Sequence, residues 1–377
     1  MNVDFNTNIL SQLLHQSTDK AKLFDKFPKA DEWETQQTKP TFKQLISLAK
    51  HFNIPFGYFF LDEIPVKKYP IPHYRSLKGS PFRPSPELLD SIETVQQRQV
   101  WAKDILKDYR NPLNFANSVT IKTPIKETAQ KIRDLLQLPI DWAGAANITS
   151  WNEAFKLLLV RTETTGIFVI LNGVVDNNTH RPLDMNEFRG FVLYDDYAPF
   201  IFINNNDFIT GKIFTIIHEI VHVLLGQSAS FDFHNLTPAQ NEIEEYCNSV
   251  TAEFLVPQEL IVNEFNKIGH NYEALSKVFK VSKIVIARRL LDTGNITKTE
   301  FIRAYNSFKV SKTEGTKSTT PGGLFYNTAP YRISREFFKL IYNAVKANKI
   351  LYRDAFKLTG LKSSSFDGYV KEYYNSD

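Results

Sequence analysis

The stretch TIIHEIVHVLLG, from Thr215 to Gly226, places three polar groups inside an apolar segment. His218, Glu219 and His222 interrupt residues 213–225, which otherwise consist almost entirely of Ile, Val, Leu and Phe. The apolar residues predict a buried helix. Burying two imidazoles and a carboxylate without partners costs several kcal/mol, so such a helix requires something that satisfies all three groups.

The spacing of these polar residues predicts a metal site. Residues four apart on an α-helix share one face, so His218 and His222 can both direct a ring nitrogen at one ion. Glu219 lies about 100° further round the helix, beside the ion rather than on it. In this H-E-x-x-H arrangement two histidines hold zinc and the glutamate acts as the base on water. The alternative is a pair of hydrogen-bonded histidines in an apolar core.

A catalytic zinc ion needs a third protein ligand and one open position. The extended pattern with Gly at 225 and His at 228 is excluded, because Leu225 and Ser228 stand there. The later segment NEIEEYCNSVTAEFLVP, residues 241–257, offers four glutamates instead. They are Glu242, Glu244, Glu245 and Glu253.

Periodicity selects one of these glutamates. The inward stripe of the segment is predicted at Cys247, Val250, Thr251 and Phe254. Glu244 precedes this stripe by one turn on the same face and is the predicted third ligand, whereas Glu242 and Glu245 are expected to face solvent. Cys247 could lie near the metal, although a small buried apolar role is the better interpretation.

The oxyanion that forms during hydrolysis also needs a hydrogen-bond donor. His234, Tyr194 and Tyr197 lie within chain reach of the predicted site. Each is better explained as a structural residue, so no residue is assigned this role.

FTIIHEIVHVLLG followed by IEEYCNSVTAEFLVP resembles the ImmA/IrrE-type metallopeptidase family. The family pattern is an HExxH helix, then Glu-x-x-(Ala/Cys)-Asn leading to Leu-x-Pro, and the resemblance covers roughly residues 160–310. It implies His218, His222 and Glu244 as ligands of one Zn²⁺ ion and Glu219 as the base. It also implies a regulatory protease that cleaves a partner protein, often a repressor.

Residues 25–65 resemble the end of an XRE-type helix-turn-helix domain, with ADEWETQ, residues 30–36, as the middle helix. Residues 17–24 match the usual first helix of the turn poorly. Residues 1–66 carry 7 basic and 8 acidic groups, a net charge of −1. Since phosphate neutralisation supplies most of the affinity for duplex DNA, this charge is weak for a DNA-binding domain. The alternative is a helical module for dimerisation or substrate docking.

The length of 377 residues and the pattern of the sequence predict a multidomain α+β protein. Strand-forming segments occur only at 166–175, 189–196 and 199–206, and predict a small, mostly antiparallel sheet before the HExxH helix, with a hairpin joining the last two. Ser150 is a predicted helix N-cap. The expected parts are a helix-turn-helix-like bundle (1–66), a linker with helices (67–115), a zincin-like metallopeptidase domain (116–310), a flexible linker (311–330) and a C-terminal helical region (331–377). Within the first linker, residues 66–90 are expected to be extended. The metallopeptidase domain is expected to consist of a core (160–260) and a helical subdomain (262–308).

Composition excludes several classes of protein. Cys247 is the only cysteine, so neither an intrachain disulfide nor a thiolate zinc cage can form. No run of about 18 apolar residues predicts a membrane span, and the N-terminus lacks the layout of a signal peptide, so a cytoplasmic protein is expected. A homodimer is an expected assembly.

Charge is unevenly distributed along the chain. Basic and acidic groups number 16 and 13 in residues 1–110, 9 and 18 in residues 111–261, and 20 and 10 in residues 262–377. The net charges are therefore +3, −9 and +10, which favours contact with polyanions at the ends of the chain. The alternative is that these charged residues simply lie on solvent-exposed faces of the protein. A nucleic-acid role for residues 331–377 is a weaker alternative, because their aromatic residues follow the helical spacing of a core.

A second function from another class is a DNA- or partner-binding transcriptional regulator. It could be the antitoxin of a two-gene module, and its zinc fold would then be structural or sensory.

Overall fold

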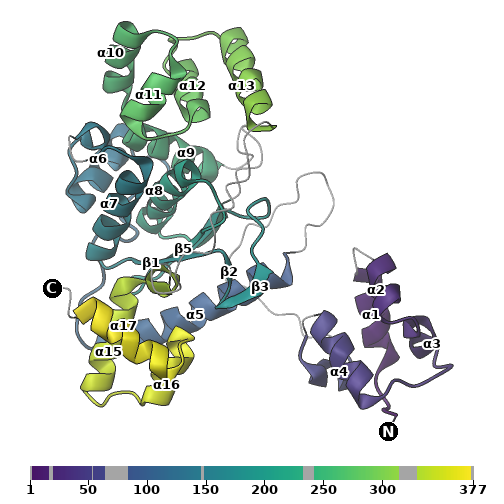
Figure 1. The fold of residues 1–377 in the computed structure, drawn as a ribbon. Coiled ribbons are helices and arrows are strands. Elements are labelled where there is room, and N and C mark those ends of the chain that lie inside the picture. The colour runs from purple at the N-terminus through teal and green to yellow at the C-terminus, as the bar shows by residue number, and fades with distance from the viewer. Residues whose placement is uncertain are drawn as a thin grey trace. The chain divides into compact units, whose positions relative to one another are not determined.

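The computed structural model describes residues 2–16, 20–52, 54–63, 84–145, 148–231, 242–313 and 329–374. The chain divides into two compact units, Met1–Tyr69 and Pro70–Asp377 (Figure 1). No helix in the described ranges combines the length and the apolar character that crossing a membrane requires.

The first unit is a bundle of short helices, as expected, although the helix predicted over residues 30–36 ends at Glu34. They are α1 (Thr7–Gln16), α2 (Lys20–Lys26), α3 (Ala30–Glu34), α4 (Phe42–His51) and the 3₁₀ turn η1 (Phe56–Phe60). Thr41 begins α4 with a capping box, in which its hydroxyl accepts from the backbone N–H of Gln44 and the Gln44 side chain accepts in return. Trp33, Leu45 and Phe59 pack in a core that this unit forms by itself.

The second unit is built on a four-stranded mixed sheet in the order β1-β5-β4-β6. The strands are β1 (Phe168–Asn172), β4 (Gly190–Leu193), β5 (Phe200–Asn204) and β6 (Ala229–Phe231). The predicted hairpin of β4 and β5 is confirmed, and β4 also pairs antiparallel with β6. Two of the three pairings described for this sheet are antiparallel, as predicted, and the third, between β1 and β5, is parallel. The chain between them is long enough to return β5 to the same direction.

The predicted strand 166–175 is in fact two elements. It divides at Gly173 into β1 and the short strand β2 (Val174–Val175), which pairs with β3 (Asn178–Pro182) in a separate two-stranded sheet. The side chain of Asn206 donates to the Gly173 carbonyl, and a Cβ at Gly173 would lie 2.3 Å from Asn206 Oδ1. Close packing against Asn206 therefore accompanies the break.

Both faces of the main sheet are covered, which explains why its strands are apolar without alternation. Helices α7 (Trp151–Thr164) and α8 (Ile209–Leu225) pack on one face, and α5 (Pro86–Lys107) and α15 (Arg335–Lys346) contact the other (Figure 1). All five residues of β5 are buried as a result. Ile201 and Ile203 join the core beneath α8, whereas Phe200 contacts Phe337 of α15.

Further helices complete the second unit. They are α6 (Ile125–Leu136), the 3₁₀ turn η2 (Trp142–Gly144), α9 (Glu242–Leu255), α10 (Gln258–Ile268), α11 (Tyr272–Phe279), α12 (Lys283–Asp292), α13 (Lys298–Thr313), the 3₁₀ turn η3 (Ala329–Arg332), α16 (Tyr352–Thr359) and α17 (Ser363–Tyr374). The predicted N-cap is confirmed: Ser150 and Glu153 form a capping box at the start of α7.

Helices occupy described parts of both predicted linkers. Of the extended segment 66–90, residues 66–83 lie outside the described residues, and the prediction is wrong for residues 86–90 because α5 begins at Pro86. Proline fits the first turn of a helix, and the Ser85 hydroxyl accepts from the backbone N–H of Leu88. Of the flexible linker 311–330, residues 314–328 lie outside the described residues, while α13 continues to Thr313 and η3 begins at Ala329.

Candidate metal centre

Helix α8 carries the predicted metal-binding residues through the middle of the second unit. It lies between the sheet, α7 and α9, and every residue from Ile213 to Leu225 is buried. Gly226 ends the helix with φ 72°, and a Cβ there would lie 2.6 Å from Asn117 Oδ1. His218, Glu219 and His222 are therefore enclosed by protein.

Three side chains from two helices bring their metal-binding atoms together. His218 Nε2 and His222 Nε2 of α8 are 3.1 Å apart. Glu244 of α9 brings Oε2 to 3.2 Å from His218 Nε2 and Oε1 to 3.4 Å from His222 Nε2. Ligand atoms about 2.0–2.1 Å from one tetrahedral zinc ion lie about 3.3 Å from one another. The spacing of these three side chains thus fits a zinc ion.

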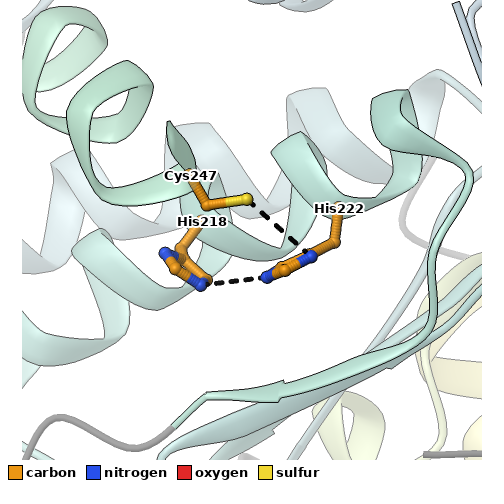
Figure 2. Close-up of side chains that lie close together, drawn as sticks. All are labelled: His218, His222 and Cys247. Atoms are coloured by element: carbon orange, nitrogen blue, oxygen red, sulfur yellow. Dashed lines mark hydrogen bonds between the residues drawn. The ribbon is translucent and has the colours of Figure 1, made fainter. Parts of the chain in front are cut away.

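Cys247 is the fourth polar side chain of the cluster. Its Sγ lies 3.8 Å from His222 Nδ1, and Figure 2 shows that this contact involves a different ring nitrogen from the one that faces His218. His218, His222 and Cys247 are buried and offer ligand atoms that all lie within 4.8 Å of one another. This buried group could hold a metal ion.

Glu219 is fully buried, and neither of its carboxylate oxygens has a hydrogen-bond partner among the described residues. It faces β4, where a Cβ at Gly190 would lie 3.4 Å from Glu219 Oε1 and 2.5 Å from Thr215 Cγ2. Gly190 therefore leaves the space that α8 occupies. A buried carboxylate without a partner is costly. A cation with its bound water is a partner that would satisfy it.

The electrostatics of the cluster favour a cation. Burial, followed by the charge of Glu244, raises the pKa of Glu219 well above its usual range. Burial also raises the pKa of Glu244, but hydrogen bonds with His218 and His222 outweigh it and hold that pKa well below the usual range. Burial lowers the pKa of His218, against the opposing effect of Glu244. Neutral imidazole beside an ionised carboxylate is the donor set that zinc prefers.

Residues 163–291 match a peptidase family model described as the IrrE N-terminal-like domain. This range, called the IrrE-like domain below, contains α8 and α9 and supports the resemblance to ImmA/IrrE-type peptidases. Residues 333–372, which include α15 and α16, match a domain of unknown function. The comparisons with curated proteins and with solved structures give no match.

The remaining glutamates of α9 lie away from the cluster. Glu242 and Glu245 are exposed, as expected. Glu253 is buried and forms an ion pair with Arg289 of α12.

Burial raises the pKa of the Cys247 thiol well above its usual range, with a further contribution from Glu244.

The three residues that were considered as oxyanion donors gain no support. Tyr194 follows β4, and its hydroxyl donates to Asp196. Tyr197 lies in the same connection, where its carbonyl accepts from Arg110. His234 lies outside the described residues.

Sequence reasoning missed the β4 side of the IrrE-like domain's cluster. Gly190 leaves room for the side chains of Thr215 and Glu219, but it is far from them in sequence and does not belong to the HExxH pattern. Thr215 precedes Glu219 by four residues, so it lies on the same face of α8. This spacing could have indicated that Thr215 lies beside Glu219. The position of Gly190 depends on how the strands pair, which the sequence does not reveal.

Proposed function

We propose that the IrrE-like domain is a zinc-dependent peptidase that hydrolyses a peptide bond in a partner protein. His218, His222 and Glu244 would hold one zinc ion, and Glu219 would serve as the general base. The observation that carries this proposal is the position of Glu244, whose two carboxylate oxygens lie 3.2 and 3.4 Å from the two histidine Nε2 atoms. A structural pair of core histidines does not require a carboxylate at that point.

In the proposed reaction the bound zinc ion and Glu219 have different roles. A zinc ion in this position supplies Lewis-acid chemistry, because it polarises a carbonyl group and acidifies water. Glu219 accepts the proton that the attacking water loses and passes it to the leaving amine. Its burial supports this role, since a raised pKa brings a carboxylate closer to the value that suits proton transfer near neutral pH. The packing of α8 and α9 holds the base and the ligands in fixed relative positions.

The test uses purified full-length protein and the variant Glu219→Gln. We expect one zinc ion per chain in both proteins by elemental analysis, and cleavage only by the unchanged protein. Partners that co-purify with Glu219→Gln identify the substrate, which we propose to be a repressor or a similar regulator. Protein without stoichiometric metal, or full cleavage by Glu219→Gln, contradicts the proposal.

A second candidate function rests on the N-terminal unit, Met1–Tyr69, which has a hydrophobic core of its own. This core supports an independent binding module, and hence a DNA- or partner-binding regulator, such as an antitoxin, with a structural or sensory zinc site. Helix α3 carries Asp31, Glu32 and Glu34. These charges favour a protein partner over duplex DNA, because they repel phosphates.

Repression of the protein's own promoter separates the two functions. If regulation alone is the function, Glu219→Gln represses normally and His218→Ala does not. If peptidase activity is the function, Glu219→Gln loses the regulatory response.

A further inference from the structure

We propose that Cys247 is a positioning residue for His222. Its sulfur accepts a hydrogen bond from the Nδ1–H group of His222, and this bond keeps Nε2 of the same ring directed at His218 and Glu244. The inference rests on the metal site proposed above, and it assigns Cys247 a place beside the ligands rather than among them.

The geometry of the imidazole ring separates the two roles. The two ring nitrogens of His222 point in different directions, so one ion cannot bind both. Nε2 faces His218 Nε2 at 3.1 Å and Glu244 Oε1 at 3.4 Å, whereas Nδ1 faces Cys247 Sγ at 3.8 Å (Figure 2). The Nε2 side therefore gathers three donors from three residues. The Nδ1 side has only the sulfur among the described residues.

Helix α9 fixes the sulfur in this place. Cys247 follows Glu244 by three residues, so the two side chains lie one turn apart on the same face of the helix. Cys247 is fully buried, and Thr251 one turn later donates its hydroxyl to the Cys247 carbonyl. A single helix thus supplies both a carboxylate for the Nε2 side of the cluster and an acceptor for the Nδ1 side of His222.

The chemical consequence concerns the tautomer of His222. A neutral imidazole carries one proton, and it can bind a metal through Nε2 only if that proton is on Nδ1. A buried N–H group without an acceptor is costly, so an acceptor at Nδ1 stabilises the metal-binding tautomer. Partners of this kind typically contribute about 10- to 100-fold to metal affinity.

Zinc affinity measures the contribution directly. Zinc binding to the full chain is measured in competition with a chromophoric chelator. We expect Cys247→Ala to weaken binding by about 10- to 100-fold. Cys247→Ser restores most of it, because a hydroxyl oxygen also accepts a hydrogen bond. Val250→Ala, a truncation on the same buried stripe of α9, controls for lost packing and leaves the affinity within about threefold. Equal affinities for Cys247→Ala and the unchanged protein overturn the proposal.

Cobalt substitution tests the competing role of Cys247 as a direct ligand. A thiolate bound to Co²⁺ produces a charge-transfer absorption band in the near ultraviolet, and we expect no such band in the unchanged protein. A band that disappears in Cys247→Ser overturns the proposal.

The ¹⁵N shifts of the His222 ring in zinc-bound protein show which nitrogen binds the metal. We expect zinc on Nε2 and the proton on Nδ1 in the unchanged protein. Zinc on Nδ1 overturns the proposal. Because this measurement needs no substrate, failure of the peptidase function leaves it interpretable.

Discussion

Gly190 of β4 lies directly opposite Glu219 of α8, with the position of a Cβ at Gly190 only 3.4 Å from Glu219 Oε1. The same Cβ would lie 2.5 Å from Thr215 Cγ2 and 2.8 Å from the Phe202 carbonyl oxygen. A side chain at this point of the sheet would therefore push against the helix that carries the predicted base.

Gly190→Ala is expected to lower the free energy of unfolding by about 1–3 kcal/mol, because the added methyl group meets backbone and a buried side chain that cannot yield. Denaturant unfolding measures the change. Gly144→Ala is the matched control, since a Cβ at Gly144 meets nothing within 4 Å. Similar effects of the two substitutions would show that β4 and α8 are less closely packed than these distances indicate.

Glu244→Gln is expected to weaken zinc binding by more than about 100-fold, because it removes the only carboxylate that reaches both histidines among the described residues. The control is Glu245→Gln, which changes the neighbouring exposed glutamate in the same way. Elemental analysis of the dialysed proteins gives the result. Full zinc content in Glu244→Gln would exclude Glu244 as a ligand.

Glu219→Gln should separate binding from catalysis. Glutamine keeps the size of the side chain but cannot accept the proton, so turnover is expected to fall by about 10²- to 10⁴-fold while zinc remains bound. Cleavage rates of the identified partner, measured alongside zinc content, provide the check. Loss of zinc together with activity would instead place Glu219 among the ligands.

The stability of the protein is expected to depend on pH through Glu163 of α7. Its carboxylate accepts from the Ser334 hydroxyl and from the backbone N–H of Arg335. Burial, partly opposed by the Ser334 hydrogen bond, raises its pKa to about 7. The folded state therefore holds this proton more tightly than the unfolded chain. The stabilising contribution is fully present below about pH 4.5 and is lost as pH rises through about 7.

The variant Glu163→Gln tests this dependence, because glutamine does not titrate. Urea unfolding at pH 5 and pH 8 should show a decline in the unchanged protein that is smaller in the variant by up to about 3 kcal/mol. The exposed control Glu259→Gln should keep the decline. An equal decline in all three proteins would contradict the role of Glu163.

The parts of the site that could be predicted from the sequence are those that one helix determines. Four-residue spacing brings His218 and His222 together, and the apolar stripe of α9 identifies the face on which Glu244 lies. Contacts between elements could not be predicted in this way. The approach of Gly190 to Glu219 depends on strand order and on how α8 crosses the sheet.

Parts of the fold escaped prediction for a similar reason. Strand β6 is only three residues long, and its pairing with β4 joins segments on either side of α8. The parallel pairing of β1 with β5 depends on the path of the intervening chain rather than on the composition of either strand. The distance from Cys247 to one nitrogen of His222 depends on a ring orientation that sequence periodicity does not encode.

The donors of the cluster belong to two different helices, α8 and α9, so a zinc ion bound as proposed would link metal supply to the lifetime of the folded chain. An ion held by both helices would act as a removable cross-link. It would add RT ln(1 + [L]/Kd) to the folding free energy, where [L] is the free zinc concentration. When zinc is scarce, the α8–α9 pair would open more often and the chain would become easier to degrade. The abundance of the protein would then report the availability of zinc, even when no substrate is present.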